Sequence, residues 1–214
     1  MNLPRRFPAL FLAALAFAGS TAYAEAAKER YYFQLKAITA KPELKPEAVK
    51  MATPRVLAEV KKAFEHQPQL VARLEGAPDP KTDPDGYRAF LAKSHIAGAF
   101  NVNIEITDAV QLLTPKADKP GAQELEIRLA LRMLGSHIPD DTLGFTGHGK
   151  AGVQQEVGGT PSARDLEGTW DQVAELAVSA ALRTALDELA LAAKTKPKPK
   201  AKPKPSAAPA PAPQ

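Results

Sequence analysis

The chain of 214 residues contains no cysteine. An exported protein without cysteine has no disulfide framework, so burial of apolar side chains alone must stabilise its fold. The absence also excludes a thiol nucleophile and removes the lipid-bearing cysteine that would follow a lipoprotein signal. We therefore expect ordinary signal cleavage rather than an N-terminal lipid anchor.

Long apolar runs are also missing. The one near the N-terminus, residues 10–18, is shorter than the ~20 residues that cross a bilayer as a helix. Arg5 and Arg6 precede this run, and Ala22-Tyr23-Ala24 follows it as a small-x-small cleavage site. Residues 1–24 thus predict a signal peptide, with no transmembrane segment after its cleavage. The expected location is periplasmic or secreted.

Acidic residues are absent from residues 194–214, which contain seven prolines and six lysines. Proline removes amide donors and the lysines repel one another, so this segment predicts a disordered, extended tail. The tail is interpreted either as a contact with anionic envelope polymers or as a solubilising end without a partner. The candidate partner-binding lysines are Lys196, Lys198, Lys200, Lys202 and Lys204.

The positive net charge of the whole chain comes from its two ends. Of the 28 basic residues, Arg5, Arg6 and six tail lysines lie in these ends, which leaves 20 against all 24 acidic residues. The body therefore carries a net charge of about −4 by this count of ionised side chains. Because no basic folded face is indicated, the composition argues against specific nucleic-acid binding.

Residues 25–193 predict a single α/β domain. Alternating apolar and polar side chains indicate strands at residues 31–39, 97–113 and 124–138. A short strand is expected at residues 70–74, and a last one, interrupted by glycines, at residues 143–157. Helices are expected from Thr53, as N-cap before Pro54, to His66, and at residues 87–95 and 170–192. This order is typical of an α/β (α+β) two-layer sandwich. A mixed sheet of about five strands would have its helices packed on one face and water on the other.

The last predicted helix, residues 170–192, carries an apolar stripe of mostly small residues. Its members are Val173, Leu176, Ala177, Ala180, Leu186 and Leu189. Alanine lets a helix approach a sheet closely, so we expect this helix to lie across one sheet face. Trp170 at its start is interpreted either as a staple between helix and sheet or as a contact with a ligand or partner.

Two segments carry a resemblance to a known family. Residues 91–104 read LAKSHIAGAFNVNI, a helix end leading into a long strand, and residues 129–149 form a hairpin that begins LALRML and ends LGFTGHG. With these segments, the element order over residues 31–192 resembles the periplasmic α/β domain shared by the TolB N-terminal domain, LpoB-type activators of peptidoglycan synthases and CsgG. The resemblance implies a binding or assembly module rather than an enzyme.

Motifs of known catalytic chemistry are incomplete in this chain. Residues 144–151 approach the phosphate loop G-x-x-x-x-G-K-[ST], but Ala151 lacks the hydroxyl that holds magnesium. The four histidines form neither H-x-x-x-H nor H-E-x-x-H, and no G-x-S-x-G occurs. We therefore expect that the protein is not an enzyme and binds no cofactor. The alternative is a periplasmic enzyme or metal-binding protein with a site near the 137–152 hairpin, where His137 and His148 would cluster with Asp140 and Asp141.

The sequence thus predicts an exported, non-catalytic binding or assembly factor of the bacterial cell envelope. Its partner would be an envelope protein or an anionic envelope polymer. The contacts are assigned to the tail lysines, to Trp170, and to Arg128 and Arg132 on the polar side of a strand. The sequence carries no signal for the oligomeric state.

Overall fold

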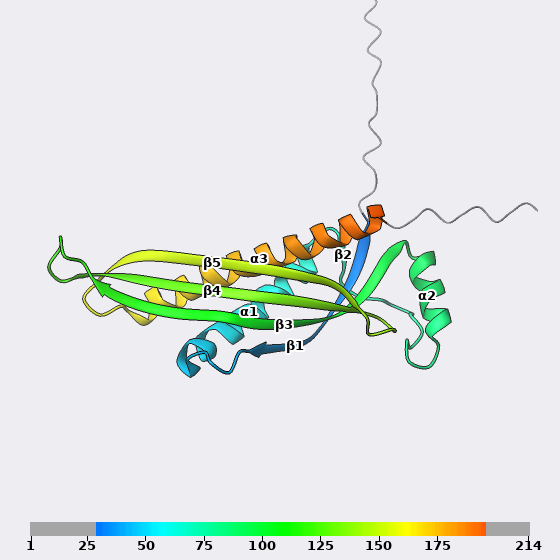
Figure 1. Ribbon diagram of the computed structural model, residues 1–214, viewed down its shortest axis with the longest axis horizontal. Helices are drawn as coiled ribbons and strands as arrows, with labels where there is room; N and C mark the ends of the chain where they lie inside the picture. Colours follow the sequence, from blue (N-terminus) through cyan, green and yellow to red (C-terminus); the bar gives the residue numbers. More distant parts are fainter. Residues whose placement is uncertain (1–28, 196–214) are drawn as a thin grey trace, which may run out of the picture.

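The expected two-layer architecture is confirmed by a computed structural model, which describes residues 29–195. One mixed sheet has the strand order β2-β1-β3-β4-β5, and α1 and α3 cover one of its faces (Figure 1). The elements are β1 (Arg30–Ala40), α1 (Pro46–His66), β2 (Leu70–Val71), α2 (Pro84–Lys93), β3 (Ile96–Pro115), β4 (Ala122–His137), β5 (Leu143–Gly158) and α3 (Ala163–Thr195). The predicted signal peptide and the tail from residue 196 lie outside the described residues, whereas Lys194 and Thr195 still belong to α3.

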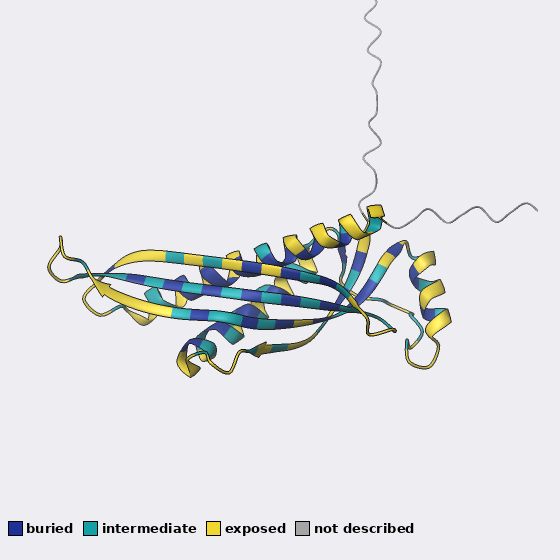
Figure 2. Ribbon diagram, in the orientation of Figure 1, coloured by how far each residue is buried: buried dark blue, intermediate teal, exposed yellow. Residues whose placement is uncertain are grey.

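The sheet combines two kinds of strand pairing. β1 pairs in parallel with β2 and β3, while β3, β4 and β5 form a long antiparallel meander. In β4 the apolar residues Leu125, Ile127 and Leu129 are fully buried, and the residues between them are half-buried. Figure 2 shows this alternation as stripes along the strand. The period of two predicted from the sequence is therefore present, with the apolar side facing α1 and α3.

Helix α1 begins earlier than the sequence indicates. It starts at Pro46 rather than after Thr53, and Pro54 lies inside the helix. The Thr53 hydroxyl instead donates a hydrogen bond to the Val49 carbonyl at 2.9 Å. A proline in a helix interior costs about 3 kcal/mol, but tertiary packing offsets such a local cost. Here that packing comes from four residues spaced four apart and buried against the sheet: Ala48, Ala52, Val56 and Val60.

Helix α3 also starts before its predicted first residue, Trp170. Its N-terminus is a capping pair, because the Ser162 hydroxyl accepts from the Asp165 N–H and the Asp165 carboxylate accepts from the Ser162 N–H. The Ser162 hydroxyl also donates to the Asp165 carboxylate, and this bond, together with that from the Ser162 N–H, lowers the pKa of Asp165. A strong cap ahead of a polar first turn is thus what places the helix start at Ala163.

The buried face of α3 differs from the predicted stripe. Buried residues recur as pairs every four positions, including Val173 with Ala174 and Ala177 with Val178, whereas Leu176 is 48% exposed. An α-helix has about 3.6 residues per turn, so a repeat of four shifts the buried face gradually around the helix. The predicted stripe assumed a buried face at a fixed angle around the helix, which is why Leu176 was wrongly placed on the buried side.

Close contact between α3 and β5 depends on two glycines. A Cβ atom at Gly147 would meet the carbonyl oxygen of Ala181, and one at Gly149 would meet that of Ala177. Side chains of α3 also reach the outer edge of β5. The Thr146 N–H donates to Glu188 Oε2 at 2.7 Å, and the His148 N–H donates to Thr184 Oγ1 at 2.8 Å.

We predict that Gly149→Ala destabilises the domain by about 1–3 kcal/mol, because the added methyl group forces α3 away from the sheet. The matched control is Gly158→Ala in the same strand, where a Cβ atom meets nothing within 4 Å. Urea denaturation of both variants measures the difference. Equal midpoints for the two variants would contradict this account of the packing.

Candidate functional site

The sheet face opposite α1 and α3 is polar along β3, β4 and β5. We call this surface the open face. Its side chains come from directly paired positions of the three strands: Asn101, Asn103, Glu105, Glu124, Glu126, Arg128, Arg132, His148, Lys150 and Gln154. The predicted solvated face is therefore present, and it contains two of the predicted partner-binding residues.

Arg128 and Arg132 lie on the open face and are partly exposed. Arg132 Nη2 lies 2.7 Å from Glu105 Oε2, and Arg128 Nε lies 3.4 Å from Glu126 Oε1. Each arginine is thus placed by a carboxylate on its own sheet. The Nε atoms of both are buried, and within residues 29–195 neither makes an aligned hydrogen bond. The exposed parts of the two guanidinium groups are therefore what a partner could contact.

The structure corrects the assignment of Trp170 as a partner contact. Its side chain is fully buried, and its Nε1–H donates a hydrogen bond to Gln111 Oε1 at 3.1 Å. The indole therefore staples α3 to β3, which was the structural alternative, and offers no surface to a partner. The five tail lysines assigned as contacts lie outside the described residues and stay predictions.

We predict that Gln111→Leu destabilises the protein by about 1–3 kcal/mol, because the buried indole N–H loses its acceptor. Gln154→Leu, at an exposed position of β5, is the control for the loss of a glutamine from a strand. Thermal unfolding followed by the fluorescence of this single tryptophan compares the two. Equal melting temperatures would show that the Trp170–Gln111 bond contributes nothing.

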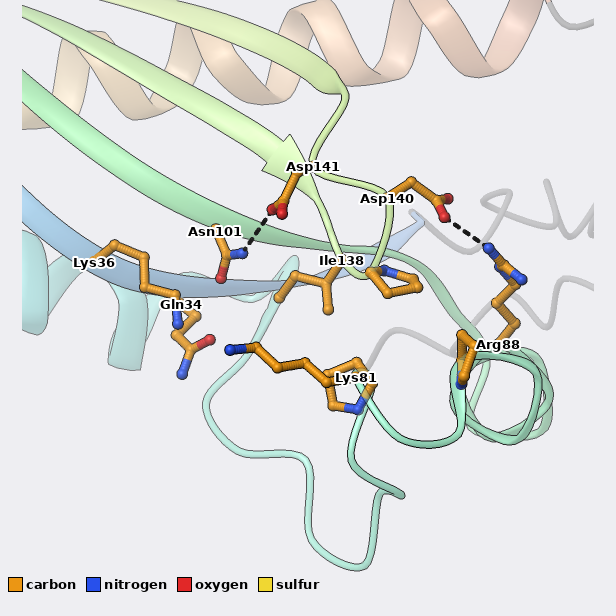
Figure 3. Close-up of a pocket in the computed structure, with 11 residues that line it drawn as sticks. Gln34, Lys36, Lys81, Arg88, Asn101, Ile138, Asp140 and Asp141 are labelled. Carbon is orange, nitrogen blue, oxygen red and sulfur yellow. Dashed lines mark hydrogen bonds and ion pairs between the residues drawn. The ribbon is translucent and has the colours of Figure 1, made fainter.

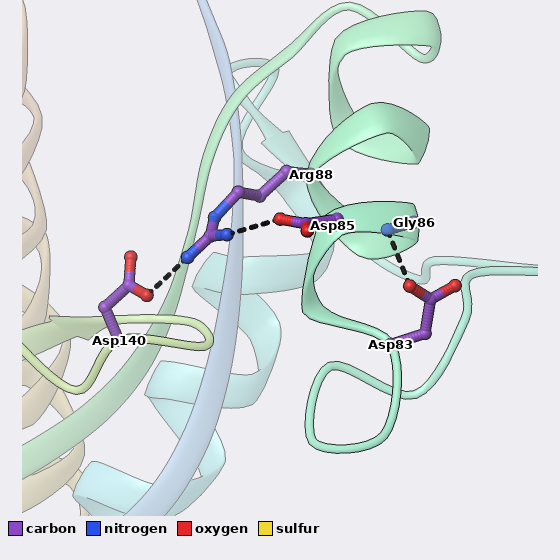
Figure 4. Close-up of polar contacts among 5 residues, drawn as sticks. All are labelled: Asp83, Asp85, Gly86, Arg88 and Asp140. Carbon is purple, nitrogen blue, oxygen red and sulfur yellow. Dashed lines mark hydrogen bonds and ion pairs between the residues drawn. The ribbon is translucent and has the colours of Figure 1, made fainter.

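The end of the sheet near the start of β1 is covered by α2. The helix starts at Pro84 after the N-cap Asp83, whose carboxylate accepts from the Gly86 N–H at 2.8 Å (Figure 4). Tyr87 on α2 packs in a second apolar cluster with Tyr32 and other residues of this end, separate from the main core. Burial raises the pKa of Tyr87 to about 12.

Arg88 joins α2 to the turn between β4 and β5. Its guanidinium lies 2.8 Å from Asp85 Oδ1 on its own helix and 2.6 Å from Asp140 Oδ1 on the turn (Figure 4). The hydrogen bond to Asp140 is the main cause of the raised pKa of Arg88. The turn itself contains a cis bond before Pro139, and Asp141 follows with φ of 50°.

Between α2, the preceding loop and this turn lies a pocket of about 470 Å³, a volume within the usual range for small-molecule sites. Lys36 and Lys81 line it on one side, and Asp140 and Asp141 on the other, with Asn101 on the floor that β3 provides (Figure 3). Sequence reasoning missed this pocket. Asp140 and Asp141 were interpreted as part of a turn, or as metal ligands with His137 and His148, and Lys36 and Lys81 belong to no motif.

The predicted cluster of His137 and His148 is wrong. His137 pairs in register with Phe100, and the two rings lie 4.6 Å apart on the helix-covered side. His148 pairs with Arg132 on the open face. Alternation along the hairpin therefore separates the two rings. Across the part of the chain that the structure describes, no three His, Asp or Glu side chains are grouped to hold a metal ion.

Comparisons with known proteins give similarity at the level of structure. No family model matches the chain, and no curated protein matches it. Among solved structures, it is similar to a candidate lipoprotein of Caulobacter crescentus (12% identity, 77% of this chain and 93% of that chain, TM-score 0.37). It is also similar to the rare lipoprotein B of Shewanella oneidensis (9% identity, 74% and 99%, TM-score 0.36).

A third similar structure is a candidate homologue of neuraminyllactose-binding hemagglutinin from Helicobacter pylori (8% identity, 78% of this chain and 90% of that chain, TM-score 0.43). All three TM-scores lie below 0.5, so these likenesses carry no argument about function. The resemblance to TolB, LpoB and CsgG stays a prediction. Within residues 29–195, no helix is long and apolar enough to cross a membrane.

Proposed function

We propose that this chain is an exported, non-catalytic binding or assembly factor of the bacterial cell envelope. In this proposal the open face contacts a partner protein, and the basic tail attracts anionic envelope polymers. The observation that carries the proposal is the pair Arg128 and Arg132. Each is held in place by a carboxylate of the sheet, and each side chain is more than two-fifths exposed on the open face.

The open face supports such contacts through its shape. β3, β4 and β5 are 20, 16 and 16 residues long, and their paired rows form one continuous surface. Charges of both signs lie along it, since in β4 the acids Glu124 and Glu126 precede the bases Arg128 and Arg132. Charges in fixed positions select a partner by complementarity and set its register more than they add to affinity. This surface suits a protein partner with an equally extended, polar side.

Placement of the charges also limits the cost of binding. Arg132 and Glu105 already hold each other in an ion pair across β4 and β3. Ordering of side chains is one of the main free-energy costs of forming an interface. Because this pair is already ordered, a partner that binds it restricts few additional side-chain torsions. The tail would act as a separate, salt-sensitive attraction, because contacts between exposed charges are screened at high ionic strength.

The proposal is tested by photo-crosslinking in growing cells. A photoreactive amino acid is placed at Lys150 or Gln154 on the open face, and for comparison at Lys50 or Lys61 on the exposed side of α1. We predict discrete crosslinked adducts from the open-face positions and none from the α1 positions. The double variant Arg128→Glu, Arg132→Glu should abolish these adducts, because it reverses the charges that a partner meets.

A charge-matched control, Lys50→Glu with Lys61→Glu, should leave the adducts unchanged. Truncation after Thr195 separates the tail from the domain, since α3 ends there. Adducts that persist without the tail place the partner contact on the domain. Equal adducts from α1 and the open face, or adducts insensitive to the arginine reversal, would refute the proposed surface.

A further inference from the structure

The pocket at the end of the sheet has charges that its own residues leave unpaired. Figure 3 shows the ammonium groups of Lys36 and Lys81 extending toward the same space beside Gln34. No carboxylate among the described residues forms an ion pair with either lysine. Two cations that face a shared space repel each other, and an anion between them relieves that repulsion. This side of the pocket is therefore suited to an anionic group.

The kind of anion follows from which cations are free. Arg88, the only arginine among the described residues that line the pocket, is already bound to Asp85 and Asp140. The forked, bidentate recognition typical of arginine with carboxylates is thus unavailable here. Lysines act as point charges, and in that form they are common phosphate ligands. The free cations of the pocket favour a phosphate group.

The opposite side of the pocket offers acceptors instead. Asn101 Oδ1 is buried and has no hydrogen-bond partner within the described chain, although the Asn101 amide nitrogen donates to Asp141 Oδ1 at 3.5 Å. Asp141 makes no ion pair with any described residue. Asn101 thus helps to position the Asp141 carboxylate, and a carboxylate without an ion pair favours a positively charged donor. An amine supplies such a donor.

We propose that this pocket binds a small phosphate ester that also carries an amine. Its phosphate lies between Lys36 and Lys81, and its amine lies against Asp141, which Asn101 helps to position. The chemistry is that of phosphoethanolamine, whether free or as the headgroup of a phospholipid. This site uses other residues than the open-face arginines, so it extends the proposed function and does not depend on it.

The test is a titration of the mature protein, from Glu25, with phosphoethanolamine, followed by the NMR shifts of backbone amides. We expect saturable shifts around Asn101 and Asp141. Lys36→Ala and Lys81→Ala should each weaken binding about tenfold, the loss expected for one charged hydrogen bond. Lys50→Ala, which removes an exposed lysine of α1, should leave the affinity unchanged.

The amine side is tested with a second ligand. Asp141→Asn preserves the backbone, since asparagine tolerates a positive φ. This variant should weaken the binding of phosphoethanolamine but not of glycerol phosphate, which lacks the amine. An equal effect on both ligands would overturn the assignment of the amine to Asp141. The absence of saturable shifts, or shifts unaffected by Lys36→Ala and Lys81→Ala, would overturn the site.

Sedimentation with vesicles identifies the source of the ligand. Binding to phosphatidylethanolamine vesicles but not to phosphatidylcholine vesicles, lost with Lys36→Ala, shows a lipid headgroup. Binding of free phosphoethanolamine alone shows a soluble ligand, and either result supports the site. The Arg128→Glu, Arg132→Glu variant should bind phosphoethanolamine normally. Failure of the open-face proposal is therefore distinguishable from failure of this one.

Discussion

The rest of the structure depends on the direct approach of α3 to β5. Gly147 and Gly149 leave no side chain between the strand and the helix, so the carbonyl groups of Ala177 and Ala181 lie against the strand backbone. This closeness brings Thr184 and Glu188 within reach of the amides of β5. It also sets the position of Trp170 at the other end of the helix. The helix in turn covers the apolar side of the long meander, which leaves the opposite face free for polar residues.

The sequence predicted the architecture well because two simple periods dominate it. The alternation in β4 identified that strand and the sides of Arg128, Arg132 and Leu129. The starts of α1 and α3 were misplaced for a local reason. Thr53-Pro54 has the pattern of a helix start, but burial of Ala48 and Ala52 extends the helix through it. Local preference and tertiary packing disagree there, and packing prevails.

The candidate sites were harder to predict than the fold. The pocket joins Lys36, Lys81, Asn101 and Asp141, which come from four separate parts of the chain, and no spacing in the sequence links them. His137 and His148 show the opposite case. The two histidines are near in sequence, but the strand alternation and the turn place them on different faces of the sheet. The number of residues between them does not predict this. A side chain's face is predictable within one strand, whereas a site formed by several elements needs the register among them.

The bonds from Thr184 and Glu188 to the outer amides of β5 have a consequence for self-association. An edge strand with free amides is a template onto which another chain adds, and that addition begins aggregation. At Thr146 and His148 an incoming strand would first have to displace two hydrogen bonds that already satisfy the edge. At the other margin of the sheet, β2 pairs with β1 only at Tyr31 and Tyr32, so β1 itself forms the margin beyond them. There the irregular pairing of β1 with β3 at Lys36 places a charge and a bulge. The two margins of the sheet thus resist the growth of sheets from one molecule into the next.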